Sequence, residues 1–118
     1  MIRSFQRTVA DWVMRAFGKD ALDNQKERNF RFLEESLELV QSLGLSAEDA
    51  QKVVAYVYSR PKGEPYQEVG GVTVTLAALC ECAGINMSEA GNAEVRRIYS
   101  KIAEIQKKQS EKKAVSAL

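Results

Sequence analysis

The stretch QEVGGVTVTL, residues 67–76, decides between an all-helical chain and a mixed one. Its valines and threonines alternate with a period of two, and β-branched residues favour strands. A single strand, however, finds no pairing partner elsewhere in the sequence and would leave backbone groups unsatisfied. The continuation LAALCECAG is rich in helix formers and ends at Gly84, a helix stop signal. We therefore predict one helix from about Pro65 to Ala83.

The rest of the chain also has helical periodicity. Apolar residues recur at steps of three and four and predict helices over residues 2–17, 21–43, 46–60 and 88–105. Ser46, three residues before Asp49, is a typical N-cap, and Ser88 is placed to cap the last helix. Short connections favour antiparallel neighbours. The predicted fold class is all-α, a bundle of four to five antiparallel helices.

Length and composition indicate a single globular domain. The 118 residues are 45% apolar and 28% charged, and their formal net charge is +1. We expect one helical-bundle domain over residues 1–105 and a frayed or disordered basic tail over 106–118. A net charge of +1 is too small to attract nucleic acid or a membrane surface electrostatically. The basic runs RRIYSK and KKQSEKK are nearly balanced by nearby acids.

Localisation is predicted from the same composition. No run approaches the ~20 apolar residues of a membrane-spanning helix, and the N-terminal segment mixes charges throughout. Cys80 and Cys82 point about 200° apart on a helix, so they are poorly placed to share a disulfide or a metal. We expect a cytoplasmic protein with reduced, semi-buried cysteines and no membrane partner.

The sequence contains no histidine. This excludes Ser-His and Cys-His nucleophilic mechanisms, together with zinc sites that depend on imidazole. Any chemistry is therefore expected to use carboxylates, lysines, arginines or a bound hard metal ion.

Acidic residues cluster on the second predicted helix. Glu38 lies about 60° from Glu35 and about 40° from Glu34 around the helix, beside an apolar stripe, so like charges share one face. Glu68 is the acid on another helix that can meet them. Carboxylates that converge in a bundle need a cation, and oxygen-only ligation favours Mg²⁺ or Mn²⁺. The alternative is an ordinary solvated helix face.

Two motifs carry a resemblance to a known family. EESLE, Glu34 to Glu38, is followed some thirty residues later by EVGG, Glu68 to Gly71. With RNFRFLEESLELVQ and RPKGEPYQEVGGVTVTLAALCECAGI around them, the chain resembles the MazG-like, all-α nucleoside triphosphate pyrophosphohydrolases, in a bacterial or phage-type branch. The resemblance extends from about Arg28 to Lys101.

The resemblance implies a helical bundle, commonly a homodimer or higher oligomer, that binds Mg²⁺. It implies cleavage of a nucleoside triphosphate to the monophosphate and pyrophosphate, by a water that attacks the α-phosphorus in line. By the same comparison Glu35, Glu38 and Glu68 match metal ligands, and Glu34 orients or deprotonates the attacking water. Gly71 departs from the pattern, because the family has a fourth carboxylate there.

Basic residues are expected near the phosphates. In the family, basic residues four apart on the last helix face the substrate, and Arg97 and Lys101 have that spacing. Arg28, Asn29 and Arg31 precede the acids on their own helix and can reach phosphate or base. The alternatives are a solvated basic face for the first pair and an intrahelical ion pair for Arg31.

The aromatic residues of the first helix also allow two interpretations. Trp12 and Phe17 can stack on a nucleobase, but an aromatic stripe on an amphipathic helix is more often core. Two functional hypotheses remain open from the sequence. One is a Mg²⁺-dependent pyrophosphohydrolase that cleans the nucleotide pool. The other is a non-catalytic relative that binds a nucleotide or a protein, which the glycine at position 71 favours.

Overall fold

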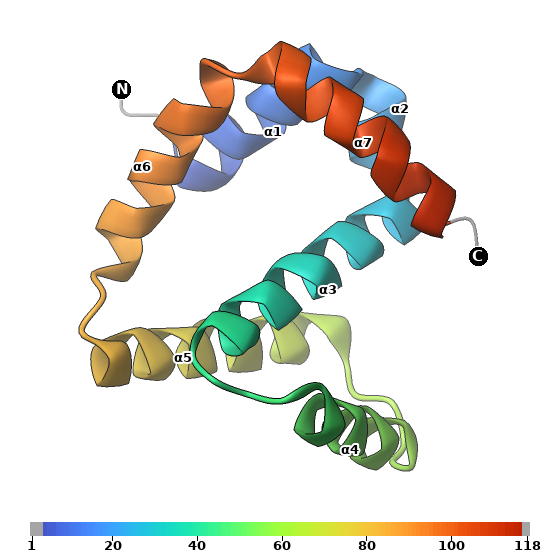
Figure 1. Cartoon of the computed structure of the whole chain (residues 1–118), viewed down its shortest axis with the longest axis vertical. Helices are drawn as coiled ribbons and strands as arrows, with labels where there is room; N and C mark the ends of the chain where they lie inside the picture. Colours follow the sequence, from blue (N-terminus) through green and yellow to red (C-terminus); the bar gives the residue numbers. More distant parts are fainter. Residues whose placement is uncertain (1–3, 117–118) are drawn as a thin grey trace. The chain divides into compact units, whose positions relative to one another are not determined.

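The computed structural model describes residues 4–116, and these residues form helices with no strand. The elements are α1 Phe5–Phe17, α2 Lys19–Asp23, α3 Gln25–Ser42, α4 Ala47–Tyr58, α5 Pro65–Ala83, α6 Met87–Tyr99 and α7 Ile102–Ser116 (Figure 1). The all-α prediction is confirmed. Within residues 4–116, no single helix is long and apolar enough to cross a membrane, and only the bent pair of α5 and α6 meets that criterion jointly.

The stretch that decided the fold class is helical, and both ends of α5 are capped. At the first turn, the Glu64 carboxylate accepts the backbone N–H groups of Tyr66 and Gln67 at 3.0 and 3.3 Å. Pro65 occupies the first turn, where its missing N–H costs nothing. At the other end, Gly84 adopts the left-handed conformation with φ 71°. The predicted boundaries of this helix are confirmed.

Other helix boundaries differ from the prediction. The segment expected as one helix over 21–43 is divided, because the Asn24 side chain accepts the Glu27 N–H at 3.0 Å and begins α3. The last predicted helix is interrupted between Tyr99 and Ile102. Ser88 lies inside α6 rather than capping it, because α6 begins at Met87. The described residues thus form seven helices rather than four to five.

The chain divides into two compact units. The terminal unit comprises Met1–Leu33 and Ser88–Leu118, and the middle unit comprises Glu34–Met87. Helix α7 belongs to the terminal unit and occupies much of the segment expected to be a frayed tail. Its polar residues are good helix formers, and Gln109 is buried.

The terminal unit contains the hydrophobic core. Trp12, Val13 and Ala16 of α1 are buried, and Ile98, Ile102 and Ile105 pack against them. The rings of Trp12 and Phe17 meet edge to face, with centroids 5.5 Å apart. The interpretation of these two aromatic residues as core is therefore confirmed, and their surfaces face protein.

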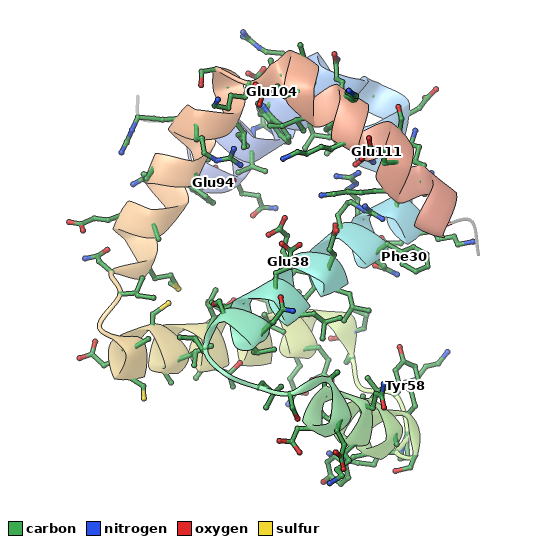
Figure 2. All side chains as sticks on the ribbon, viewed as in Figure 1. Phe30, Glu38, Tyr58, Glu94, Glu104 and Glu111 are labelled. Atoms are coloured by element: carbon green, nitrogen blue, oxygen red, sulfur yellow. The ribbon has the colours of Figure 1, made fainter. Side chains whose placement is uncertain are left out.

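The middle unit has no buried residue among residues 34–87. Its helices instead present apolar side chains to solvent, including Leu37, Val53, Val57, Val69, Val72 and Val74. Tyr58 at the end of α4 is 85% exposed (Figure 2). The amphipathic stripes that the sequence predicted are present, but this chain alone does not cover them.

Candidate metal and nucleotide site

The acids of the first motif lie on α3 within the middle unit. Glu34 is half-buried, whereas Glu35 and Glu38 are exposed. Figure 2 shows the Glu38 side chain projecting from this helix. The helix is continuous across the motif, so residues three and four apart share a face, as predicted.

Glu68 lies one turn into α5, also in the middle unit. Its backbone N–H donates to the Glu64 carbonyl oxygen at 3.0 Å, which sets its place in the helix. Its side chain folds back over Gly63. A Cβ built on that glycine would lie 2.9 Å from Glu68 Oε2 and 3.0 Å from its Cδ.

Glu38 and Glu68 differ from most other glutamates of the chain in having no assigned partner. Neither carboxylate makes a hydrogen bond or ion pair among residues 4–116. Other glutamates are engaged locally: Glu48 pairs with Lys52 at 3.6 Å, Glu94 with Arg97 at 2.6 Å, and Glu104 with Lys101 at 3.9 Å. The Glu38 and Glu68 carboxylates are therefore available to bind a cation.

The donor chemistry of these acids fits Mg²⁺ or Mn²⁺, which prefer carboxylate oxygens. The described part of the chain nevertheless contains no group of three acids or cysteines close enough to hold a metal ion. Glu34, Glu35 and Glu38 share a helix, but the single chain does not gather them with Glu68. Cys80 is half-buried and Cys82 exposed, both as free thiols.

Gly71 leaves open space where the family pattern has an acid. Apart from the adjoining residues and the local backbone of α5, no atom lies within 4 Å of a Cβ built at this position or at Gly70. Thr75, one turn further, donates its hydroxyl to the Gly71 carbonyl oxygen at 2.9 Å. The hydrogen of that hydroxyl is thus directed to the backbone of α5.

The basic residues before the first motif lie in the terminal unit around a buried carboxylate. Glu27 accepts a hydrogen bond from the Gln109 side chain and lies 3.5 Å from Arg31 Nε and 3.9 Å from Arg28 Nη2. From its spacing, Arg31 was expected to pair with Glu34 or Glu35, three and four residues later; the structure shows an intrahelical ion pair with Glu27, four residues earlier. Asn29 accepts a hydrogen bond from Gln25 Nε2 at 2.8 Å.

The guanidinium of Arg28 is partly removed from solvent. Burial lowers the pKa of its guanidinium, the charge of Arg31 acts in the same direction, and Glu27 opposes both. Its Nε and Nη2 atoms are buried without a hydrogen-bond acceptor. Sequence reasoning missed the Glu27–Gln109 contact, because Gln109 falls in the segment expected to be disordered and no local pattern links the two residues.

Arg97 and Lys101 do not share a helix, contrary to the spacing argument. Arg97 is on α6, which ends at Tyr99, and Lys101 lies in the turn before α7. Arg97 donates from Nε and Nη2 to the Glu94 carboxylate at 2.8 and 2.6 Å. This hydrogen-bonded pair lowers the pKa of Glu94. Both cations thus have the local acidic partners of an ordinary solvated helix surface.

The chain matches no protein-family model, no curated protein and no solved structure in the three comparisons made. The resemblance to the MazG-like enzymes therefore stays a prediction from the two sequence motifs.

Proposed function

We propose that this protein is a Mg²⁺-dependent nucleoside triphosphate pyrophosphohydrolase that converts a nucleoside triphosphate and water to the monophosphate and pyrophosphate. The observation that supports the proposal is the availability of Glu38 and Glu68. Each belongs to one of the two motifs, both lie in the middle unit, and neither has a partner among the described residues. A helical protein that leaves these carboxylates exposed can use them for a divalent cation.

The proposed roles follow the motifs. Glu35, Glu38 and Glu68 bind the metal, and Glu34 accepts a proton from the attacking water. Bound Mg²⁺ would lower the pKa of that water and neutralise phosphate charge. Glu34 is half-buried, whereas Glu35 and Glu38 are exposed on the same helix.

Phosphate binding is proposed for Arg97 and Lys101, with Arg28, Asn29 and Arg31 as further contacts. Arg97 already donates from Nε and Nη2 to the Glu94 carboxylate, so a phosphate would bind its remaining guanidinium N–H groups or compete with Glu94. Two guanidinium nitrogens of Arg28, Nε and Nη2, are buried without a hydrogen-bond acceptor. A phosphate oxygen that reached them would satisfy these donors.

The proposed active form is a homodimer or higher homo-oligomer. No residue of the middle unit is buried, and α4 and α5 expose apolar side chains such as Val57 and Val72. Large exposed apolar patches of this kind mark interaction surfaces. We propose that a second copy of the chain covers the exposed valines of α4 and α5. Analytical ultracentrifugation tests this, because Val72→Asp should reduce the oligomer relative to the wild type.

The decisive experiment measures pyrophosphate release with Mg²⁺ over a panel of canonical and modified nucleoside triphosphates. We expect turnover of at least one nucleotide and its loss in Glu38→Gln. Glu81→Gln is the matched control, because Glu81 is an exposed acid of α5 outside both motifs, and it should retain activity. Turnover no greater than that of Glu38→Gln across the panel would overturn the proposal.

A second function is favoured by Gly71 and by the absence of a three-acid group among residues 4–116. In this alternative the chain is a non-catalytic relative that binds a nucleotide or a partner protein. Calorimetry separates the two functions: nucleotide binding without turnover supports the relative, and binding with pyrophosphate release supports the enzyme. Without metal or nucleotide binding, only a protein-interaction role remains.

A further inference from the structure

Helix α7 turns one continuous face toward the rest of the terminal unit. Ile102 and Ile105 are half-buried and pack against the core, and further along the helix Gln109 is buried and Lys112 half-buried. These four residues follow one another at steps of three and four positions, so they share one face. The inward face of α7 is therefore apolar at its beginning and polar, with a cation, toward its end.

The polar half of this face meets the beginning of α3 at the buried carboxylate of Glu27. Gln109 Nε2 donates to Glu27 Oε1, and the same oxygen lies 3.5 Å from Arg31 Nε and 3.9 Å from Arg28 Nη2. Lys112 comes one turn after Gln109 on the same face. Helix α7 thus carries a third cation on the face that contacts Glu27.

The guanidinium of Arg28 has donors that Glu27 does not satisfy. Its Nε and Nη2 atoms are buried and have no hydrogen-bond acceptor within the described part of the chain. Burial lowers the pKa of Arg28, Glu27 opposes this shift, and the charge of Arg31 adds to it. Because buried donors are normally paired, this position favours a further negatively charged acceptor.

The acids of α7 do not supply that acceptor. Glu104 and Glu111 are exposed, and Glu104 lies 3.9 Å from Lys101. The residue that α7 turns inward one turn after Gln109 is a lysine. A cation at this position raises the local positive charge beside the guanidiniums, where an acid would neutralise it. The arrangement fits an external oxyanion, which accepts charged hydrogen bonds from several donors at once.

We propose that α7 and the beginning of α3 form an oxyanion subsite in which Arg28 and Lys112 bind a phosphate or pyrophosphate group. The proposal rests on the part of the proposed function that assigns Arg28 to phosphate binding. It adds Lys112 as a contact and α7 as the second wall, and α7 lies beyond the stretch that carries the family resemblance. An anion that bridges the two helices should also hold α7 in place, since a ligand stabilises the state that binds it.

The first test titrates inorganic pyrophosphate into the metal-free protein by calorimetry, in EDTA and at constant ionic strength. We expect the wild type to bind, and Arg28→Gln and Lys112→Gln to bind about tenfold more weakly, the scale of one charged hydrogen bond. Lys108→Gln is the matched control, because it removes the same charge from an exposed position of α7 and should bind as the wild type does. Circular dichroism should show the same helicity in all four proteins.

The second test follows α7 itself by amide hydrogen exchange. Pyrophosphate should slow exchange over residues 105–113 in the wild type and in Lys108→Gln but not in Lys112→Gln. A nucleoside triphosphate, also in EDTA, forms the other arm. Protection at a lower concentration than pyrophosphate requires identifies the phosphates of a nucleotide as the ligand, whereas protection at an equal or higher concentration identifies the free anion.

The outcomes separate this proposal from the proposed function. If the wild type does not bind pyrophosphate, or if Lys108→Gln weakens binding as much as Lys112→Gln does, the subsite is wrong. Pyrophosphate release with Mg²⁺ then still decides whether the protein is an enzyme. Conversely, pyrophosphate binding that depends on Arg28 and Lys112, in a protein without turnover, supports the subsite and overturns the enzyme.

Discussion

The indole N–H of Trp12 donates to the carbonyl oxygen of Ile98 at 3.1 Å, across 86 positions of sequence. This bond joins α1 to α6 inside the terminal unit, where Trp12 is 9% exposed. Tyr99 adds a second link between the same helices, because its hydroxyl donates to Asp11 Oδ2 at 2.8 Å. The core of this unit is therefore held by directional polar contacts as well as by apolar packing.

Replacing Trp12 should destabilise the protein measurably. Trp12→Phe removes the donor and part of a buried ring, and we expect a loss of about 1–3 kcal/mol in the free energy of unfolding. Urea denaturation followed by circular dichroism measures it. Tyr58→Phe is the control, because Tyr58 is 85% exposed and should change stability by less than about 0.5 kcal/mol. Equal stability of the two variants would contradict the packing described for α1.

The contact between Gln109 and Glu27 should hold α7 against the terminal unit. Gln109→Ala leaves a buried carboxylate without its amide donor, which costs about 1–3 kcal/mol. We expect faster amide hydrogen exchange over residues 105–113 in this variant. Lys108→Ala changes an exposed neighbour on the same helix and should leave exchange unaltered. Identical exchange in both variants would show that the contact does not hold the helix.

The cap of α5 depends on the Glu64 carboxylate. Glu64→Ala should cost about 1 kcal/mol of unfolding free energy, the usual loss when an N-cap side chain is removed. Glu64→Asp supplies a favoured capping residue and should restore most of the stability. Thermal denaturation of the wild type, Glu64→Ala and Glu64→Asp measures these differences. If Glu64→Asp is as unstable as Glu64→Ala, the capping role of Glu64 is wrong.

Acid should weaken the pair formed by Glu94 and Arg97. The hydrogen bond from Arg97 lowers the pKa of Glu94 from the ordinary value of a glutamate. The pair therefore stabilises the folded protein fully above the pKa that Glu94 has in the unfolded chain. This stabilisation is lost as the pH falls through the lower pKa that Glu94 has in the folded protein. Because both side chains are about half exposed, we expect only about 0.2–1 kcal/mol.

The contribution of the Glu94–Arg97 pair to stability is measured as the difference in unfolding free energy between the wild type and Glu94→Gln. This difference should be present at pH 7, shrink below about pH 4.5 and diminish in high salt. A difference that persists unchanged at low pH would refute the electrostatic origin.

Restoring an acid at position 71 should strengthen cation binding. Gly71→Asp is accommodated because no atom outside the adjoining residues and the local helix backbone lies within 4 Å of a Cβ there. A carboxylate about 4 Å from a divalent ion in water contributes about 2 kcal/mol before salt screening, so we expect about tenfold tighter Mn²⁺ binding. Gly71→Asn, of equal size without charge, is the control. Equal Mn²⁺ affinity in the two variants would contradict a metal site beside this position.

Local signals in the sequence determined the helices and most of their ends. Pro65 and Gly84 bracket α5, and Ser46 accepts the Asp49 N–H at 3.1 Å as the cap of α4. These signals succeed because caps and stop residues act within one turn of the chain. The break at Asn24 was missed because an asparagine inside a periodic segment is compatible with both a continuing helix and a new cap.

The candidate site was predicted in part for the same reason. The shared face of Glu34, Glu35 and Glu38 follows from helical spacing, and the structure retains it. The convergence with Glu68 depends on how separate helices pack, and the middle unit of a single chain does not bring three ligands together. Periodicity shows which face of a helix is apolar, but it does not show what covers that face.

The sequence by itself therefore determined an all-α chain, the limits of α5 and the acids that a helix places together. Tertiary structure alone decided that Trp12 lies in a core, that Glu27 is buried beside Gln109, and that residues 34–87 remain uncovered. The physical reason is range: helix propensity and capping act between residues a few positions apart, whereas burial depends on contacts between segments that are distant in sequence.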